Sequence, residues 1–225
     1  MKLLAIETSS SVGSVALSLP DRIEERTIAT PREQTERLLR LTDELLAEAG
    51  LALRELDGIA FGRGPGSFTG LRVAAAVAQG FAAPSGVPLL PVSSLLCLAQ
   101  GAFRTTGVRR ALVCVDAHMG EVYWAEFEIR DGRADPLGPE RLGAPAEIAP
   151  PAGAGWTAVG DGFAAQRAAL EAAVAGAEGV LTGLNPAAQD LLPQARRDLE
   201  AGRAVAAAQA LPVYLREHTA WRRSS

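Results

Sequence analysis

An apolar run that ends in an acidic residue occurs twice in this chain, each time before a glycine-containing turn and a second apolar run. Leu3–Ile6 leads into Glu7, and residues 111–115 lead into Asp116. Short apolar runs bounded by turn residues predict buried strands. Because the order of strand, acid, turn and returning strand repeats, the sequence predicts two related α/β lobes.

Two lobes that each open with such a hairpin are typical of the actin, Hsp70 and sugar-kinase architecture, in which the hairpins face each other across a nucleotide cleft. We therefore expect an α/β fold with two lobes, each a mixed sheet with flanking helices. Residues 1–106 would form the first lobe and residues 107–225 the second. The last helix and the segment after it, about residues 187–217, are expected to pack back on the first lobe.

Capping signals place the helices. Residues 30–33, Thr-Pro-Arg-Glu, form a capping box with proline at the first helical position. We expect the next helix at 67–82, ending before Pro84, because proline breaks a helix interior. In the second lobe, the glycines around Asp161 precede an alanine-rich stretch that predicts another helix.

Composition narrows the functional class. The 22 basic and 26 acidic residues give a net charge of −4, which argues against a chain that holds nucleic acid by charge alone. Cys97 and Cys114 lie in apolar runs and outside any CxxC motif, so we interpret them as buried hydrophobes in a reducing compartment. The first apolar run is too short for a signal peptide or a membrane span. We expect a cytoplasmic protein with no membrane contact.

A glycine-rich loop and the two acidic strand ends are candidates for an anion or nucleotide site. Residues 62–70, GRGPGSFTG, enter a helix, and a helix N-terminus favours anions; the loop lacks the lysine of a P-loop. The alternative is a structural turn with hydroxyls that cap their own backbone. The candidates for this vestigial site are Glu7, Thr8, Ser9, Gly64, Gly66, Ser67 and Asp116.

The first two helices expose a partner surface if their apolar residues exceed what one core face needs. The helix after the glycine-rich loop has small side chains all round, and the helix before it presents leucines widely. The alternative is that both faces pack within the lobe.

Six segments in order along the chain resemble the TsaB (YeaZ) family, and GRGPGSFTGLR is highly specific to it. These segments are residues 4–9, 62–72, 91–95, 115–116, 120–125 and 212–216. The resemblance implies a role in forming threonylcarbamoyladenosine at position 37 of tRNAs that read ANN codons. It also implies that the chain is a required, non-catalytic partner of TsaD, a paralogue that transfers the threonylcarbamoyl group.

The resemblance further implies that the two helices form the docking face, for a TsaD-like transferase or for a second copy in a homodimer. The residues predicted there are Leu38, Leu41, Leu45, Phe68, Gly70, Leu71, Val73, Ala74 and Val77. Gly70→Arg or Ala74→Glu should then break the complex and leave the monomer folded. A TsaE-like ATPase would join the complex, tRNA would be reached only through it, and ATP or ADP would bind at the TsaD interface with no tightly bound cofactor.

One departure from TsaD bears on catalysis. TsaD-like proteins carry a His-x-x-x-His metal pair where this chain has Ser94 and Leu98, so we expect no metal here, and no peptidase chemistry either. The alternative function is a stand-alone ATP-binding phosphotransferase of the sugar-kinase type, for which Glu7 and Asp116 would supply the carboxylates.

Overall fold

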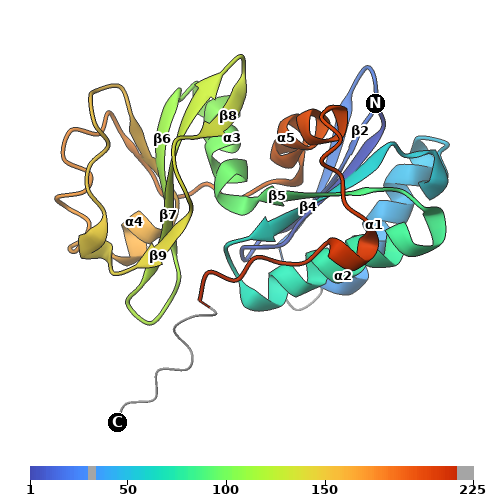
Figure 1. Ribbon diagram of the computed structural model, residues 1–225, viewed down its shortest axis with the longest axis horizontal. Helices are drawn as coiled ribbons and strands as arrows, with labels where there is room; N and C mark the ends of the chain where they lie inside the picture. The colour runs from blue at the N-terminus through green and yellow to red at the C-terminus, as the bar shows by residue number, and fades with distance from the viewer. Residues whose placement is uncertain (30–33, 217–225) are drawn as a thin grey trace, which may run out of the picture.

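The computed structural model describes residues 1–29 and 34–216, except for the side chains of residues 34 and 35. The predicted capping box at residues 30–33 lies outside the described residues. Two mixed sheets with flanking helices form two lobes, as Figure 1 shows, and this confirms the predicted fold class. None of the helices in the described ranges combines the length and the hydropathy needed to cross a membrane.

Both sheets have the same strand order, so the sequence repeat is a structural repeat. The first sheet has the order β3-β2-β1-β4-β5, and the second contains the corresponding path β8-β7-β6-β10-β11, with β9 paired to β7. The strands are β1 (Leu3–Glu7), β2 (Gly13–Ser18), β3 (Ile23–Ile28), β4 (Gly58–Gly64), β5 (Leu89–Ser93), β6 (Arg110–Asp116), β7 (Val122–Arg130), β8 (Arg133–Pro136), β9 (Arg141–Gly143), β10 (Thr157–Val159) and β11 (Val180–Leu181).

In each lobe the central strand is antiparallel to the returning strand of its hairpin and parallel to the strand on its other side. The α-helices are α1 (Gln34–Glu48), α2 (Phe68–Ser85), α3 (Ser94–Thr106), α4 (Gly162–Ala165) and α5 (Ala188–Glu200), and the 3-10 turns are η2 (Leu53–Glu55), η3 (Pro145–Glu147) and η4 (Ala207–Gln209). Helices α1 and α2 cover one face of the first sheet.

Helices α3 and α5 lie between the two sheets (Figure 1). One continuous hydrophobic cluster joins β1, β4 and β5 of the first sheet, both helices, and β6 and β7 of the second sheet. The two lobes therefore share a core, in which Cys97 of α3 is buried as predicted. Cys114 of β6 is buried as well, and burial raises its pKa to about 12, so neither thiol is a ready nucleophile.

Two helix predictions are wrong. Helix α2 continues through Pro84 and ends at Ser85, before Gly86 at φ 71°. A proline this near the C-terminus removes only one hydrogen bond of the last turn, so the helix tolerates it. Helix α4 has only four residues, and the alanine-rich stretch after it forms turns that bury Leu170 and Ala173 against the second sheet. There, tertiary packing overrides the helical propensity of alanine.

Candidate functional site

The carboxylate at the end of β1 is buried and faces protein rather than a cleft. The side chain of Glu7 is fully buried; its Oε1 accepts a hydrogen bond from the Ser9 amide at 2.5 Å, and its Oε2 accepts one from Ser94 Oγ at 3.0 Å. A Cβ on Gly62 would lie 2.1 Å from Glu7 Oε2, so only glycine leaves room for this carboxyl. Glu7 therefore joins the first hairpin, β4 and α3 into one polar cluster.

Burial raises the pKa of Glu7, although the hydrogen bonds from Ser9 and Ser94 oppose the shift. The folded state then holds this proton more tightly than the unfolded chain does. The free energy of unfolding should consequently fall as the pH rises from about 4.5 through the folded-state pKa. Denaturant titrations across this range should show the decline, and Glu7→Gln should lack it. Parallel pH profiles for the two proteins would contradict the assignment.

The glycine-rich loop is held to the hairpin by its own hydrogen bonds. The Ser67 amide donates to the Ser9 carbonyl at 2.8 Å, and Thr8 Oγ1 donates to the Gly70 carbonyl at 2.7 Å. Ser67 is also the N-cap of α2, where its hydroxyl accepts from the Gly70 amide. Gly64 has φ 101°, and a Cβ there would meet Leu71. These contacts favour the structural-turn interpretation of the loop over the anion-site interpretation.

The space between the two hairpins is almost filled. The cavity that touches Ser9, Ser94, Val115 and Asp161 has a volume of 20 Å³. Ligand pockets for drug-sized molecules measure about 300–1,000 Å³. A nucleotide does not fit at this point in this conformation of the chain, whereas Gly66, Ser67 and Asp116 of the predicted site line a larger cavity nearby.

Asp116, the second predicted carboxylate, does not face Glu7 across a cleft. Its backbone amide donates to Asp161 Oδ1 at 3.0 Å, and its own carboxylate accepts from the His118 amide and contacts His118 Nδ1, both at 3.0 Å. Asp116 thus stabilises the turn of the second hairpin, in which His118 and Met119 both have positive φ. Its side chain lies at the wall of a different and larger cavity.

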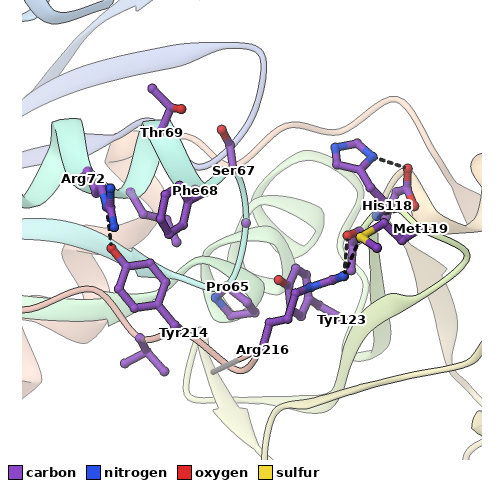
Figure 2. A pocket seen from close by; sticks show the side chains of 15 residues that line it. Pro65, Ser67, Phe68, Thr69, Arg72, His118, Met119, Tyr123, Tyr214 and Arg216 are labelled. Carbon is purple, nitrogen blue, oxygen red and sulfur yellow. Dashed lines mark hydrogen bonds and ion pairs between the residues drawn. The ribbon is translucent and has the colours of Figure 1, made fainter. Parts of the chain in front are cut away.

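This larger cavity of 560 Å³ lies between the start of α2 and the turn of the second hairpin, and Figure 2 shows its lining. On one wall, the Arg72 guanidinium lies 3.8 Å above the Phe68 ring and donates from Nε to the Tyr214 hydroxyl at 3.1 Å. The opposite wall holds Met119, which is exposed, and Tyr123, which is half-buried. Mostly apolar lining with a few converging polar groups is typical of a binding site.

The C-terminal segment connects the two walls of the cavity. The Val213 amide donates to the Arg63 carbonyl at 2.8 Å, which fixes the segment beside β4. Arg216 donates to the Ala117 carbonyl at 2.7 Å (Figure 2). It also forms an ion pair with Glu121 at 2.9 Å. The sequence identified residues 212–216 as a motif but did not place them at a site. No sequence pattern indicates that residues 213–216 lie beside the second hairpin.

Most of the predicted docking residues are buried inside the first lobe. Their direct contact with a partner is a wrong prediction for Leu38, Leu45, Gly70, Leu71, Ala74 and Val77. Phe68 is 55% exposed, and Leu41 and Val73 are half-buried, so for these three the prediction stands. The sequence missed Leu39, which is 42% exposed on α1, and Ala76, which is exposed on α2. The residue spacing alone did not separate the core face from the outer face.

The positions of the TsaD metal pair lie at the start of α3. Ser94 and Leu98 are both buried, and Ser94 Oγ is committed to Glu7. Neither a leucine side chain nor this serine is a typical metal ligand. Within the described residues, no three His, Cys, Asp or Glu side chains gather in a possible metal site.

Comparison with known proteins identifies the family. A protein from Escherichia coli K12 named "tRNA threonylcarbamoyladenosine biosynthesis protein TsaB" is 38% identical over 99% of this chain and 98% of its own length. The chain belongs to the TsaB family. The TsaB protein of Haemophilus influenzae is 41% identical over 60% of this chain and 57% of its own length. The family profile described as "TsaD: tRNA N6-adenosine threonylcarbamoyltransferase" matches residues 28–220.

Solved structures agree with membership of the TsaB family, which is also called YeaZ. "YeaZ from Pseudomonas aeruginosa" has a TM-score of 0.88 at 40% identity and covers 95% of this chain and 99% of that one. Another Pseudomonas aeruginosa structure, described as similar to "peptidase YEAZ", has a TM-score of 0.89 at 40% identity, covering 96% of this chain and 99% of its own. This TsaB-family chain therefore takes part in the biosynthesis of threonylcarbamoyladenosine in tRNA.

Proposed function

We propose that this chain is a non-catalytic subunit that docks on a TsaD-like threonylcarbamoyltransferase and activates it. The reaction would form N6-threonylcarbamoyladenosine at position 37 of tRNAs that read ANN codons. The observation that carries this proposal is the 20 Å³ cavity between the hairpins, because a chain with no room for a nucleotide there is poorly suited to its own transfer chemistry. The same observation argues against the stand-alone phosphotransferase.

The docking surface in this proposal is the exposed part of α1 and α2. Its apolar members are Leu39, Leu41, Phe68, Val73 and Ala76. Exposed apolar side chains that line neighbouring helices are typical of a partner surface. The same surface would join two copies of the chain when the transferase is absent.

The other parts of the proposal concern the whole assembly. A TsaE-like ATPase would join it in the cytoplasm, and ATP or ADP would bind at the contact with the transferase. The open 560 Å³ cavity lies at the start of α2, beside Phe68 of the docking surface. A tightly bound cofactor of this chain is not part of the proposal.

Reconstitution tests the proposal directly. Transfer RNA, threonylcarbamoyl-AMP and the TsaD-like transferase are combined with or without this chain, and modified adenosine is measured. We expect product only when both proteins are present. Product formed without this chain would overturn the activator role, and product formed by this chain alone would overturn the non-catalytic role.

Charge placed on the docking surface should abolish the complex without unfolding the chain. We expect Phe68→Glu and Ala76→Glu each to weaken capture of the transferase at least tenfold, because a buried unpaired carboxylate costs well over 1.4 kcal/mol. Both positions are exposed, so the thermal midpoint should change little. Leu137→Glu, at an exposed leucine after β8, is the matched control and should bind normally. If both test variants capture the transferase normally, the assignment of the docking surface to α1 and α2 is wrong.

A further inference from the structure

A separate cavity of 270 Å³ opens where β2, β8 and α5 meet, away from the cavity of Figure 2. Its lining includes Ser18 at the end of β2, Arg133 at the start of β8, and Leu192, Arg196 and Glu200 on α5. Both lobes therefore contribute to it. It lies beside the turn that joins Ser18, at the end of β2, to its paired residue Ile23, at the start of β3.

The side chains of two arginines in this cavity have no partner among the described residues. Arg133 and Arg196 are exposed, and the guanidinium group of neither makes an ion pair or hydrogen bond with residues 1–29 or 34–216. By contrast, Arg197 beside them pairs with Asp135, and Arg203 on the same side of the molecule pairs with Asp198. In a chain of net charge −4, two unpaired guanidinium groups from different lobes at one cavity form a local concentration of positive charge.

A buried hydroxyl opens into the same cavity. The side chain of Ser18 is 2% exposed, and its Oγ makes no hydrogen bond within the described part of the chain. Ser14 lies on the same face of β2, four residues earlier, and its Oγ accepts from the Ala188 amide at 2.7 Å. Because this hydroxyl lines the cavity and has no protein partner among the described residues, it is available to donate a hydrogen bond to a ligand there.

We propose that this cavity binds a phosphodiester group of an RNA backbone. Two guanidinium groups and one hydroxyl match the oxygens of a tetrahedral phosphate. The carboxylate of Glu200 lines the cavity too, and it disfavours a doubly charged phosphate monoester more than a singly charged diester. The choice of RNA rests on the role in tRNA modification. The site would be a direct contact with tRNA, additional to the docking surface, and it departs from the expectation that tRNA is reached only through the complex.

Binding of fluorescently labelled tRNA by the full chain, measured by anisotropy at a series of salt concentrations from about 20 mM upward, tests the proposal. Arg133→Ala/Arg196→Ala should weaken binding several-fold and reduce the slope of log K against log salt by about 1, as expected for one lost phosphate contact. Glu200→Gln should strengthen binding. The matched control is Arg54→Ala/Arg167→Ala, which removes two exposed arginines outside the cavity and should leave the slope nearly unchanged.

Three outcomes would overturn the proposal: no tRNA binding by the wild-type chain at the lowest salt, equal losses in the test and control variants, or full competition by inorganic phosphate at concentrations that leave ionic strength constant. Thermal unfolding of each variant checks the fold. Capture of the transferase is measured on the same variants and should be unaffected by the arginine changes. A failed phosphate site and a failed docking surface are thereby distinguished.

Discussion

Gly70→Ala should lower the free energy of unfolding by at least about 3 kcal/mol, whereas Gly80→Ala in the same helix should raise it by about 0.5–1 kcal/mol. A Cβ on Gly70 would lie 1.8 Å from the Thr8 carbonyl oxygen, which is backbone and cannot move without shifting the first hairpin. A Cβ on Gly80 meets nothing within 4 Å. Chemical denaturation of the two variants beside the wild type measures both changes.

This pair of variants also corrects the interface test that the sequence suggested. Gly70→Arg would disrupt the monomer before it could report on a partner, and Ala74→Glu would bury a charge at a fully buried position. Loss of binding by either variant would say nothing about docking. A Gly70→Ala protein as stable as the wild type would show that α2 does not approach the hairpin as closely as described.

Arg104→Ala should cost about 2–3 kcal/mol at neutral pH, which is below the usual range for a broken buried ion pair because the arginine is partly in water. Asp190 is 2% exposed, and Arg104 holds both of its carboxylate oxygens, at 2.7 and 2.9 Å. This pair joins α3 to α5 in the layer between the two sheets. Without Arg104 the carboxylate is buried without a counter-charge.

The loss of stability caused by Arg104→Ala should depend on pH in a defined direction. Burial already raises the pKa of Asp190 although Arg104 opposes the shift, so removal of Arg104 should raise that pKa further. The cost of Arg104→Ala should therefore be largest above the raised pKa of the variant and shrink as the pH falls through the raised pKa values of both proteins, because the carboxyl then becomes protonated. Arg104→Leu/Asp190→Leu should recover most of the stability, because no charge remains buried. A loss independent of pH would rule out the ion pair as its cause.

Local patterns were sufficient to predict the two hairpins and the repeated lobe. The apolar runs that end in Glu7 and Asp116 predicted strands, and their repeat predicted two related lobes; the structure adds that the two sheets share one strand order. The helix after the glycine-rich loop was also predicted from the sequence, although the role of Ser67 as its N-cap was not. These features depend on residues close together in the chain, which is why the sequence alone reveals them.

The candidate site depends on contacts between distant residues, and there the sequence was less informative. Helical spacing showed that Leu38 and Leu45 share a face but not that this face is in the core. Glu7 and Asp116 end equivalent strands, yet Glu7 is turned into a polar cluster with Ser94 and Asp116 into its own hairpin turn. The burial and the partners of these side chains depend on residues that other elements bring into contact with them.

The C-terminal segment gives the two lobes a further connection besides their shared core. The chain leaves the first sheet after α3 and returns to it at α5. Beyond α5, the Ala210 carbonyl accepts from Gln79 Nε2 of α2, and Arg216 donates to the Ala117 carbonyl at the second hairpin. Residues 210–216 therefore connect α2 to the second lobe along the backbone, so any relative movement of the lobes would have to stretch this segment as well as disturb the shared core.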